Sequence, residues 1–290
     1  MRRVVAPNLE RPVYERYPSA AAPRDSLKAA VFARINRDRK SAGLPPVAWD
    51  EDAGRVADGF CAQQVREKTR GHYLMDGIPP YARTAFAGVF GMQLENSASW
   101  LTTGASFRQD ARELALSGHA QMMAEVPPND GHRKTILDPD ATHVGVGWNS
   151  EGGRFQMAEE FLARRLAWLR LARLPGDRVI LRFEGETLSP HHIQIVTIAR
   201  EEAPARLSQK AASGRNWYAY PQARQSLVPE GYRMGVSGMA AQDRIRLGQD
   251  RRFSFEVAPD RPGLWTLVFY TAGSPGERGR PAASATFWVE

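Results

Sequence analysis

Residues 128–148 read PNDGHRKTILDPDATHVGVGW, and this stretch says more about the fold than any other part of the chain. A short helical pattern begins at His132 and ends before Pro139, because proline cannot continue a helix. In the following segment, VGVGW at 144–148, apolar side chains alternate with glycines, which predicts a strand. A histidine at such a helix–strand junction is well placed to face a cleft, so the stretch predicts a functional site as well as two elements.

Composition places the chain among globular proteins. It has 290 residues, of which 42% are hydrophobic, enough for one large domain or two ordinary ones. The net charge of +7 is spread along the chain without a run of five or six basic residues, so no specific nucleic-acid partner is predicted. Cys61 is the only cysteine, which excludes an intramolecular disulfide. Its apolar helical neighbours favour a buried small side chain over a reactive thiol.

The N-terminal residues leave the cellular location open between two alternatives. They begin with basic residues but contain no apolar stretch typical of a signal peptide. No apolar run approaches the roughly 20 residues that a membrane-spanning helix needs, so no transmembrane segment is predicted. The chain is therefore either cytoplasmic or an exported protein whose signal lies outside the given sequence.

The first 163 residues predict an α+β arrangement. An extended arm at 1–24 precedes a helix from Ser26 to Gly43, a helix at 51–69, a loop-rich stretch at 71–104, a helix at 107–125, a short helix at 132–137 and a hairpin of strands at 142–149 and 154–161. We therefore expect a first domain at 25–163.

The remainder of the chain has the character of an all-β domain. Short β patterns recur at 179–183, 193–198, 216–220, 253–257, 264–270 and 285–289. Their spacing predicts a sandwich-like accessory domain at 179–290. Residues 164–178 form a linker whose leucines fit a basic helix, either an interdomain connector or, as the alternative, a helix on a membrane surface.

Three positions stand out as candidate site residues. His72 follows a helix end, Glu95 and Asn96 lie in a predicted loop, and His132 opens a helix. No HExxH, CxxC, GxSxG or phosphate-binding loop is present, so any site must be assembled from distant segments. Two imidazoles and a carboxylate could hold Zn²⁺ with an open position or serve as a general acid/base pair.

Five segments together resemble one known family. They are ARINRDRKSAGLPPVAWDEDAGRVADGFC (33–61), GH (71–72), EN (95–96), GHRKTILDPDATHVGVGW (131–148) and GGRFQMAEEF (152–161). In this order they resemble the CAP superfamily of cysteine-rich secretory, antigen 5 and pathogenesis-related proteins, also called SCP-like, over about residues 25–163. Leu94 replaces the glycine usual before the glutamate, and the single cysteine indicates the cysteine-poor bacterial branch.

The resemblance implies a three-layer α-β-α sandwich with a large cleft. It places His72, Glu95 and His132 in that cleft. Many members carry a second acidic residue before the second histidine, and Glu125 is the nearest candidate here, although an exposed glutamate at a helix end is the alternative. Among the other histidines, His119 remains a rival whose orientation is open. His143 is interpreted as structural, and His191 and His192 lie outside the match.

The resemblance also implies a function. It predicts a secreted or envelope-associated protein whose cleft binds a small ligand, a lipid, a peptide or a divalent metal, with His72 and His132 as candidate zinc ligands and a cell-surface component as partner. The alternative is a protease-like hydrolase, metal-dependent or assisted by Glu95 and His132. A serine nucleophile from Ser97 or Ser99 stays open. Because the family has no single accepted reaction, an enzymatic role is uncertain, and binding is the favoured interpretation.

Overall fold

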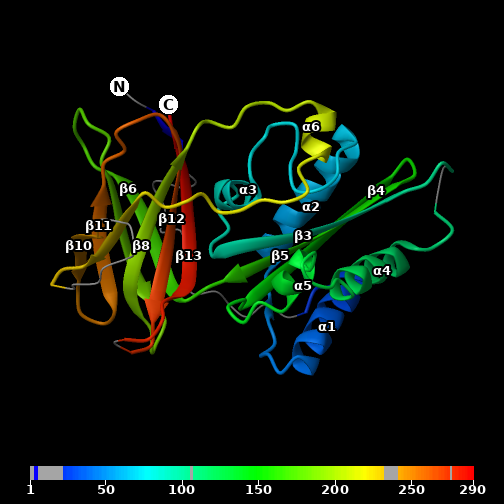
Figure 1. Cartoon of the computed structure of the whole chain (residues 1–290), viewed down its shortest axis with the longest axis horizontal. Coiled ribbons are helices and arrows are strands. Elements are labelled where there is room, and N and C mark those ends of the chain that lie inside the picture. The colour runs from blue at the N-terminus through cyan, green and yellow to red at the C-terminus, as the bar shows by residue number, and fades with distance from the viewer. Residues whose placement is uncertain (1–2, 6–21, 105–106, 232–240, 275) are drawn as a thin grey trace.

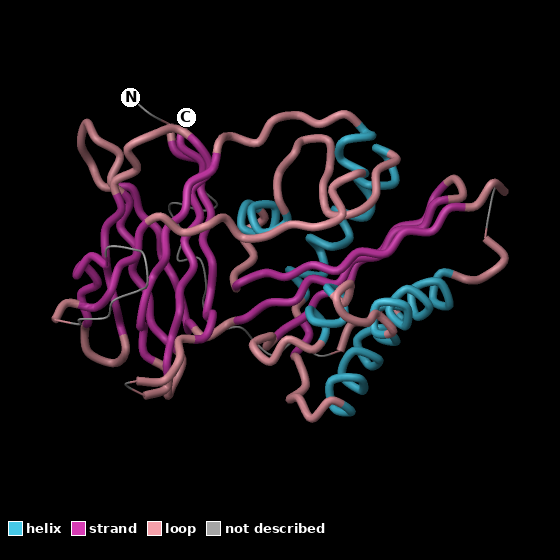
Figure 2. The backbone as a smooth tube through the Cα atoms, viewed as in Figure 1, coloured by secondary structure: helices cyan, strands magenta, loops and turns pink. Residues whose placement is uncertain are grey.

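The structure is a computed structural model that describes residues 3–5, 22–104, 107–231, 241–274 and 276–290. These residues form two β-sheets, each with its own hydrophobic core. Figure 1 shows the helices gathered around the smaller sheet, while the larger sheet makes up the other end of the molecule. Figure 2 shows the same division by secondary structure. We call residues 25–163 the N-terminal half and residues 164–290 the β-rich half.

The N-terminal half contains a four-stranded sheet in the order β2-β4-β5-β3. Its strands are β2 (Ala48–Trp49), β3 (Met92–Leu101), β4 (His143–Glu151) and β5 (Arg154–Ala163). Its helices are α1 (Ser26–Ser41), α2 (Glu51–Glu67), α3 (Pro80–Phe86), α4 (Ala111–Met123) and α5 (Gly131–Ile136). The predicted helices and hairpin are therefore present, although α4 begins only after Asp110, whose carboxylate caps the helix by accepting from the Glu113 amide at 2.8 Å.

The helices cover both faces of this sheet, which confirms the three-layer α-β-α prediction. Along β5, Phe155, Met157 and Phe161 pack with α1 and α4 in one core. The alternate residues Ala158 and Leu162 pack on the other face, against α2. Because successive side chains of a strand point to opposite faces, one strand contributes to both cores.

Glycines in β4 allow α2 to lie directly on the sheet. A Cβ atom at Gly145 would come within 2.1 Å of the Gly54 amide nitrogen, and one at Gly147 would come equally close to that of Asp58. Such contacts are impossible, so the glycines alternating with valines in the opening stretch are a packing requirement for α2.

The predicted loop-rich stretch at 71–104 contains two elements that were not predicted. One is α3, and the other is β3, the long edge strand of the sheet. Glu95 and Asn96 were expected in a loop and instead lie within β3, paired with Glu160 and Glu159 of β5. The prediction was wrong because β3 is largely polar, so the apolar alternation that marks a half-buried strand is weak.

The β-rich half contains a nine-stranded sheet in the order β1-β13-β12-β8-β9-β10-β11-β7-β6. The strands are β1 (Val4–Val5), β6 (Leu166–Arg173), β7 (Leu181–Thr187), β8 (His192–Glu201), β9 (Gln225–Pro229), β10 (Ala241–Leu247), β11 (Arg252–Val257), β12 (Gly263–Ala272) and β13 (Arg280–Val289), and a short helix, α6 (Gln209–Ser213), interrupts them. Of the predicted arm at 1–24, most lies outside the described residues, but β1 pairs with β13.

The larger sheet folds over so that its two ends pack against each other. The Phe183 ring on β7 lies with its centroid 6.3 Å from those of Phe269 on β12 and Phe287 on β13. These rings belong to one buried cluster drawn from β6, β7 and β11 on one side and β8, β12 and β13 on the other. The prediction of a sandwich-like β domain is thereby confirmed.

Two predictions in the β-rich half were wrong. Residues 166–173, expected as a basic helix, form strand β6, which pairs with β7. Leu169 and Leu171, two positions apart, are both buried, so the leucine spacing fits a strand as well as a helix. Residues 216–220, NWYAY, were expected as a strand, but they run as an extended segment outside both sheets.

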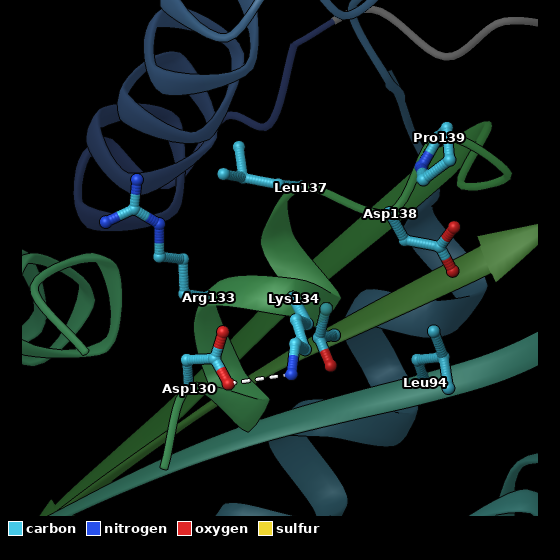
Figure 3. Close-up of a pocket in the computed structure, with 8 residues that line it drawn as sticks. Leu94, Asp130, Arg133, Lys134, Leu137, Asp138 and Pro139 are labelled. Atoms are coloured by element: carbon cyan, nitrogen blue, oxygen red, sulfur yellow. Dashed lines mark ion pairs between the residues drawn. The ribbon is translucent and has the colours of Figure 1, made fainter. Parts of the chain in front are cut away.

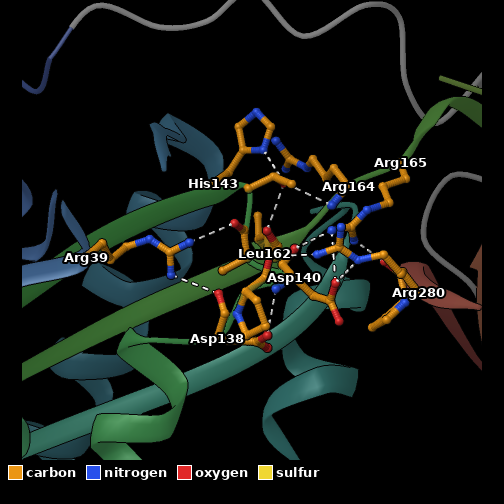
Figure 4. Close-up of polar contacts among 12 residues, drawn as sticks. Arg39, Asp138, Asp140, His143, Leu162, Arg164, Arg165 and Arg280 are labelled. Atoms are coloured by element: carbon orange, nitrogen blue, oxygen red, sulfur yellow. Dashed lines mark hydrogen bonds and ion pairs between the residues drawn. The ribbon is translucent and has the colours of Figure 1, made fainter. Parts of the chain in front are cut away.

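Polar contacts hold the two halves together around Asp140 (Figure 4). Its carboxylate oxygen accepts from Arg165 Nη2 at 3.1 Å and from Arg280 Nε at 2.6 Å. Within the β-rich half, the Arg165 amide donates to the Ala282 carbonyl of β13 at 3.0 Å. Nearby, the buried Arg39 donates to the carbonyls of Ile136 and Asp138 and thereby fixes the end of α5. None of the helices in the described ranges is long and apolar enough to cross a membrane.

Candidate ligand-binding cleft

A cavity of about 440 Å³ lies along the edge strand β3 and collects the four predicted cleft residues, His72, Glu95, Glu125 and His132. Its volume falls in the range of about 300–1,000 Å³ that is usual for small-molecule sites. His72 comes from the segment after α2, Glu95 from β3, Glu125 from the segment after α4 and His132 from α5. Tertiary packing therefore brings together residues that are far apart in the sequence.

His72 and Glu95 form a buried pair on one wall of the cleft. His72 Nδ1 lies 2.8 Å from Glu95 Oε1, and the two side chains are only 7% and 0% exposed. Arg83 of α3 donates to the other carboxylate oxygen of Glu95 and, at 3.3 Å, to the His72 carbonyl. Sequence reasoning missed Arg83, because α3 was not predicted and an arginine in a loop carries no signal.

A second buried carboxyl group lies beside this pair. Glu160 faces Glu95 across the β3–β5 ladder, and its Oε2 accepts from Gln93 Nε2 at 2.5 Å. Burial and the nearby charge of Glu95 raise the pKa of Glu160 well above its usual value, which favours its protonated form. The wall thus contains two adjacent buried carboxyl groups, of which Glu95 is paired with Arg83.

His132 and Glu125 form a second pair on the opposite wall. His132 Nδ1 lies 2.5 Å from Glu125 Oε1, and these side chains are 32% and 25% exposed. The other carboxylate oxygen of Glu125 accepts from the His132 amide at 2.9 Å. Glu125 therefore caps the first turn of α5, a role that Asp130, the residue before the helix, does not perform. This dual role makes Glu125 more than an exposed glutamate at a helix end.

The two imidazoles lie close enough to share a ligand. Their ring centroids are 6.3 Å apart with an interplanar angle of 32°. In each ring Nδ1 is paired with a carboxylate, which leaves Nε2 as the nitrogen for a bound group. Carboxylate–histidine pairs of this kind orient imidazoles that bind metals.

The two imidazoles are the side chains of the cleft that could hold a divalent cation. Among the residues that the structure describes, no three His, Cys, Asp or Glu side chains are arranged to hold a metal ion. A transition metal here would take its remaining ligands from water or from a bound molecule, as an open zinc site does. Burial, and next the Arg83 charge, lower the pKa of His72 to about 4, so its imidazole is neutral near pH 7 and able to act as a ligand.

The edge of β3 is capped by two tyrosines from the β-rich half. The amide of Gln93 donates to the Tyr220 hydroxyl at 2.9 Å, and the amide of Glu95 donates to that of Tyr218. On the open side of an edge strand, every second residue presents an unpaired amide. Two tyrosines separated by one residue in an extended segment have the same spacing, so each hydroxyl can reach one of these amides. The Tyr218 ring also lies 5.0 Å from the His72 ring, centroid to centroid. The sequence signal for these residues was the β pattern at 216–220.

His119 lies in the core next to the cleft and does not line the cavity. Its Nδ1 is 2.6 Å from Glu159 Oε1, and its Nε2 is 3.0 Å from Asp38 Oδ2. These two carboxylates outweigh burial and raise the pKa of His119, which favours the charged imidazolium. Asn96 joins this cluster to the cleft by donating to Glu159 and to the His132 carbonyl.

The remaining candidates lie outside the cavity. Ser99 donates to Gln156, and neither Ser99 nor Ser97 lines the cavity, so neither is placed as a nucleophile. The Thr142 hydroxyl forms a hydrogen bond with His143 Nδ1 at the start of β4, which agrees with a structural role for His143. Cys61 is fully buried, as predicted.

A second cavity of about 540 Å³ adjoins the cleft (Figure 3). The two cavities share Leu94 and Thr135 in their linings. The second cavity carries Arg133 and Lys134 together with Asp130 and Asp138, and Lys134 pairs with Asp130 at 2.8 Å. The described residues that line the second cavity therefore include charged side chains of both signs and no histidine.

Comparison with known proteins gives the class of this site. Residues 32–162 match the model of the CAP family, described as the cysteine-rich secretory protein family. The protein YkwD of Bacillus subtilis (strain 168) is 28% identical over 134 residues, which are 46% of this chain and 47% of YkwD. The chain thus spans about half the length of that relative.

Two solved structures show similarity over about half of this chain. An extracellular protein containing an SCP domain from Bacillus anthracis str. Ames is 20% identical, with a TM-score of 0.40, and the match covers 48% of this chain and 40% of that one. An outer surface protein from Borrelia burgdorferi is 16% identical, with a TM-score of 0.39, covering 49% of this chain and 96% of that one.

The N-terminal half is accordingly an α-β-α domain with paired histidines and carboxylates at the edge of its sheet. It is a CAP-superfamily domain, as the resemblance of the five sequence segments predicted. A β-rich half follows it in the same chain.

Proposed function

We propose that the protein is a binding protein whose cleft takes a polar ligand together with a divalent metal ion. The observation that carries this proposal is the pair of imidazoles 6.3 Å apart, each held through Nδ1 by its own carboxylate. Such second partners fix the ring orientation and raise the basicity of Nε2. A site with only two protein ligands binds the ion in exchangeable form and leaves coordination positions for the ligand.

We further propose that the protein acts outside the cytoplasm, at the cell envelope or beyond it. The CAP domain supports this location, because the family model that it matches is that of cysteine-rich secretory proteins. The single cysteine is compatible with it, because each half has a large apolar core of its own and does not depend on disulfides.

Thermal unfolding with and without Zn²⁺ tests the metal site. An ion that binds the folded chain raises the melting temperature by mass action. We expect a rise for the parent that is lost in His132→Ala and in His72→Ala, because each variant removes one of two ligands. His192→Ala is the matched control, since His192 is exposed and lies on β8 of the other sheet. A parent without a shift, or an equal shift in the His132 variant, would reject the metal site.

A hydrolase is the second candidate, supported by the His132–Glu125 pair. A partly exposed imidazole oriented by a carboxylate is suited to act as a general base toward water. If the cleft is hydrolytic, turnover of a casein-derived peptide pool must fall by about 100-fold or more in His132→Ala. Glu95 holds the His72 imidazole through Nδ1, so Glu95→Gln should also reduce the turnover of the peptide pool. Undiminished turnover in both variants would eliminate this candidate.

A further inference from the structure

Part of the cleft wall comes from outside the CAP domain. Residues 202–223 leave β8, pass over the N-terminal half and return to β9, as the yellow segment in Figure 1 shows. The segment lies directly on the loop that carries His72. The His72 amide donates to the Arg215 carbonyl at 3.4 Å. The Leu207 amide donates to the Met75 carbonyl at 2.8 Å. A Cβ atom at Gly77 would come within 2.2 Å of the Ala205 carbonyl oxygen.

This segment brings an exposed aromatic side chain to the cavity. Trp217 lines the cavity, yet 76% of its surface is exposed. Its neighbours Tyr218 and Tyr220 are anchored through their hydroxyls to β3, so the backbone beside Trp217 is held. A large exposed ring on a fixed backbone at the rim of a cavity indicates a contact surface for a ligand.

The cavity combines aromatic and polar side chains, which suits a ligand rich in hydroxyl groups. The exposed amide side chains of Asn129 and Asn216 line it beside Trp217, together with the partly exposed His132–Glu125 pair. An amide both donates and accepts, as a hydroxyl does. Aromatic rings beside planar polar side chains match a sugar ring, which has an apolar C–H face and a polar rim.

We propose that the cleft binds a β-linked glycan chain, with Trp217 stacking on one pyranose ring. The inference rests on the proposed role of the cleft as a binding site and names its ligand class. β-Linked pyranoses present a flat face to an aromatic ring. The second cavity borders the cleft at Leu94 and Thr135, so a chain that extends beyond the first sugar on this side would run along α5.

Two other ligand classes fit these contacts less well. An extended peptide would pair with the edge of β3, but tyrosine hydroxyls already occupy the amides of Gln93 and Glu95. A lipid tail needs an enclosed apolar pocket, whereas this cavity is open to solvent at Trp217 and mixes aromatic side chains with imidazoles and amides. A glycan uses the exposed indole and the amides together.

Binding of chitohexaose and cellohexaose to the full chain tests the proposal by isothermal titration calorimetry. We expect the parent to bind at least one of them and Trp217→Ala to weaken that binding by about tenfold or more. Trp217→Phe should retain part of the affinity, because a smaller ring still stacks. Leu247→Ala is the matched control, since Leu247 is also exposed, at 59%, but lies on β10.

Three results would overturn the glycan proposal. They are a parent that binds neither hexasaccharide, a Trp217→Ala variant with unchanged affinity, and binding of casein-derived peptides in place of both glycans. The proposed function fails separately, because the zinc test depends on His132 and the glycan test on Trp217. Zinc binding without glycan binding would reject the ligand class alone.

Discussion

The two walls of the cleft carry the same pair of side chains in different surroundings. The His72–Glu95 pair is 7% and 0% exposed and is surrounded by Arg83, Glu160 and Tyr218. The His132–Glu125 pair is 32% and 25% exposed and lies at the start of a six-residue helix. A buried hydrogen-bonded pair is costly to break, whereas an exposed pair contributes less to stability. The first wall is therefore a fixed support, and the second is the accessible side, where we propose that the ligand binds.

The largest effect should follow from removing the counter-ion of the buried wall. Arg83→Met leaves the fully buried Glu95 without its arginine, and loss of one partner of a buried pair costs about 3–5 kcal/mol. We expect the free energy of unfolding, measured in urea, to fall by this amount. Arg133→Met on exposed α5 is the matched control and should change it by less than about 0.5 kcal/mol. Similar values for both variants would break the comparison between the walls.

The stability of the protein should depend on pH through His72. Burial, and next Arg83, lower the pKa of His72 to about 4, so the unfolded chain, with a histidine pKa near 6.5, binds a proton more readily. The contribution of His72 is fully present above pH 6.5 and is lost as pH falls toward 4, by up to about 3 kcal/mol.

A comparison of variants isolates this effect from other titrating groups. The unfolding free energy of His72→Gln should depend less steeply on pH between about 4 and 6.5 than that of the parent. His132→Gln, on the exposed wall, serves as the matched control. His143, whose pKa burial and Arg164 also lower to about 4, contributes equally to all three proteins. An unchanged slope in His72→Gln would contradict the assignment.

A smaller effect is expected from the tyrosines that join the halves at the cleft. Tyr218→Phe removes the hydroxyl that accepts from the Glu95 amide and leaves a backbone donor of β3 unpaired. The cost of such a group is about 1–3 kcal/mol. The free energy of unfolding in urea measures this cost. Tyr73→Phe is the matched control, because the hydroxyls that accept from β3 are those of Tyr218 and Tyr220. Loss of less than about 0.5 kcal/mol would show that water replaces the hydroxyl and that the cap is weak.

Local sequence patterns predicted the parts of the fold that repeat a clear period. The helices α1 and α2 and the β4–β5 hairpin have regular apolar spacing and caps, and they formed where expected. The strand β3 was missed because its polar residues hide the alternation. Strand β6 was taken for a helix because its leucines fit both periods. Short motifs pointed to His72, Glu95 and His132, all of which line the cavity, while Glu125 was left open between the cleft and an exposed helix end.

The sequence by itself determined the CAP domain, the β-rich character of the second half and the choice of His72, Glu95 and His132 as cleft residues. These features depend on local motifs and on residue types at fixed spacings. Only the tertiary structure decided that Arg83 and Glu160 surround the His72 wall, that Glu125 caps α5, and that Trp217, Tyr218 and Tyr220 come from the other half to complete the cleft. The physical reason is that burial, charge pairing and the capping of an edge strand arise between segments up to 127 residues apart, which no local pattern records.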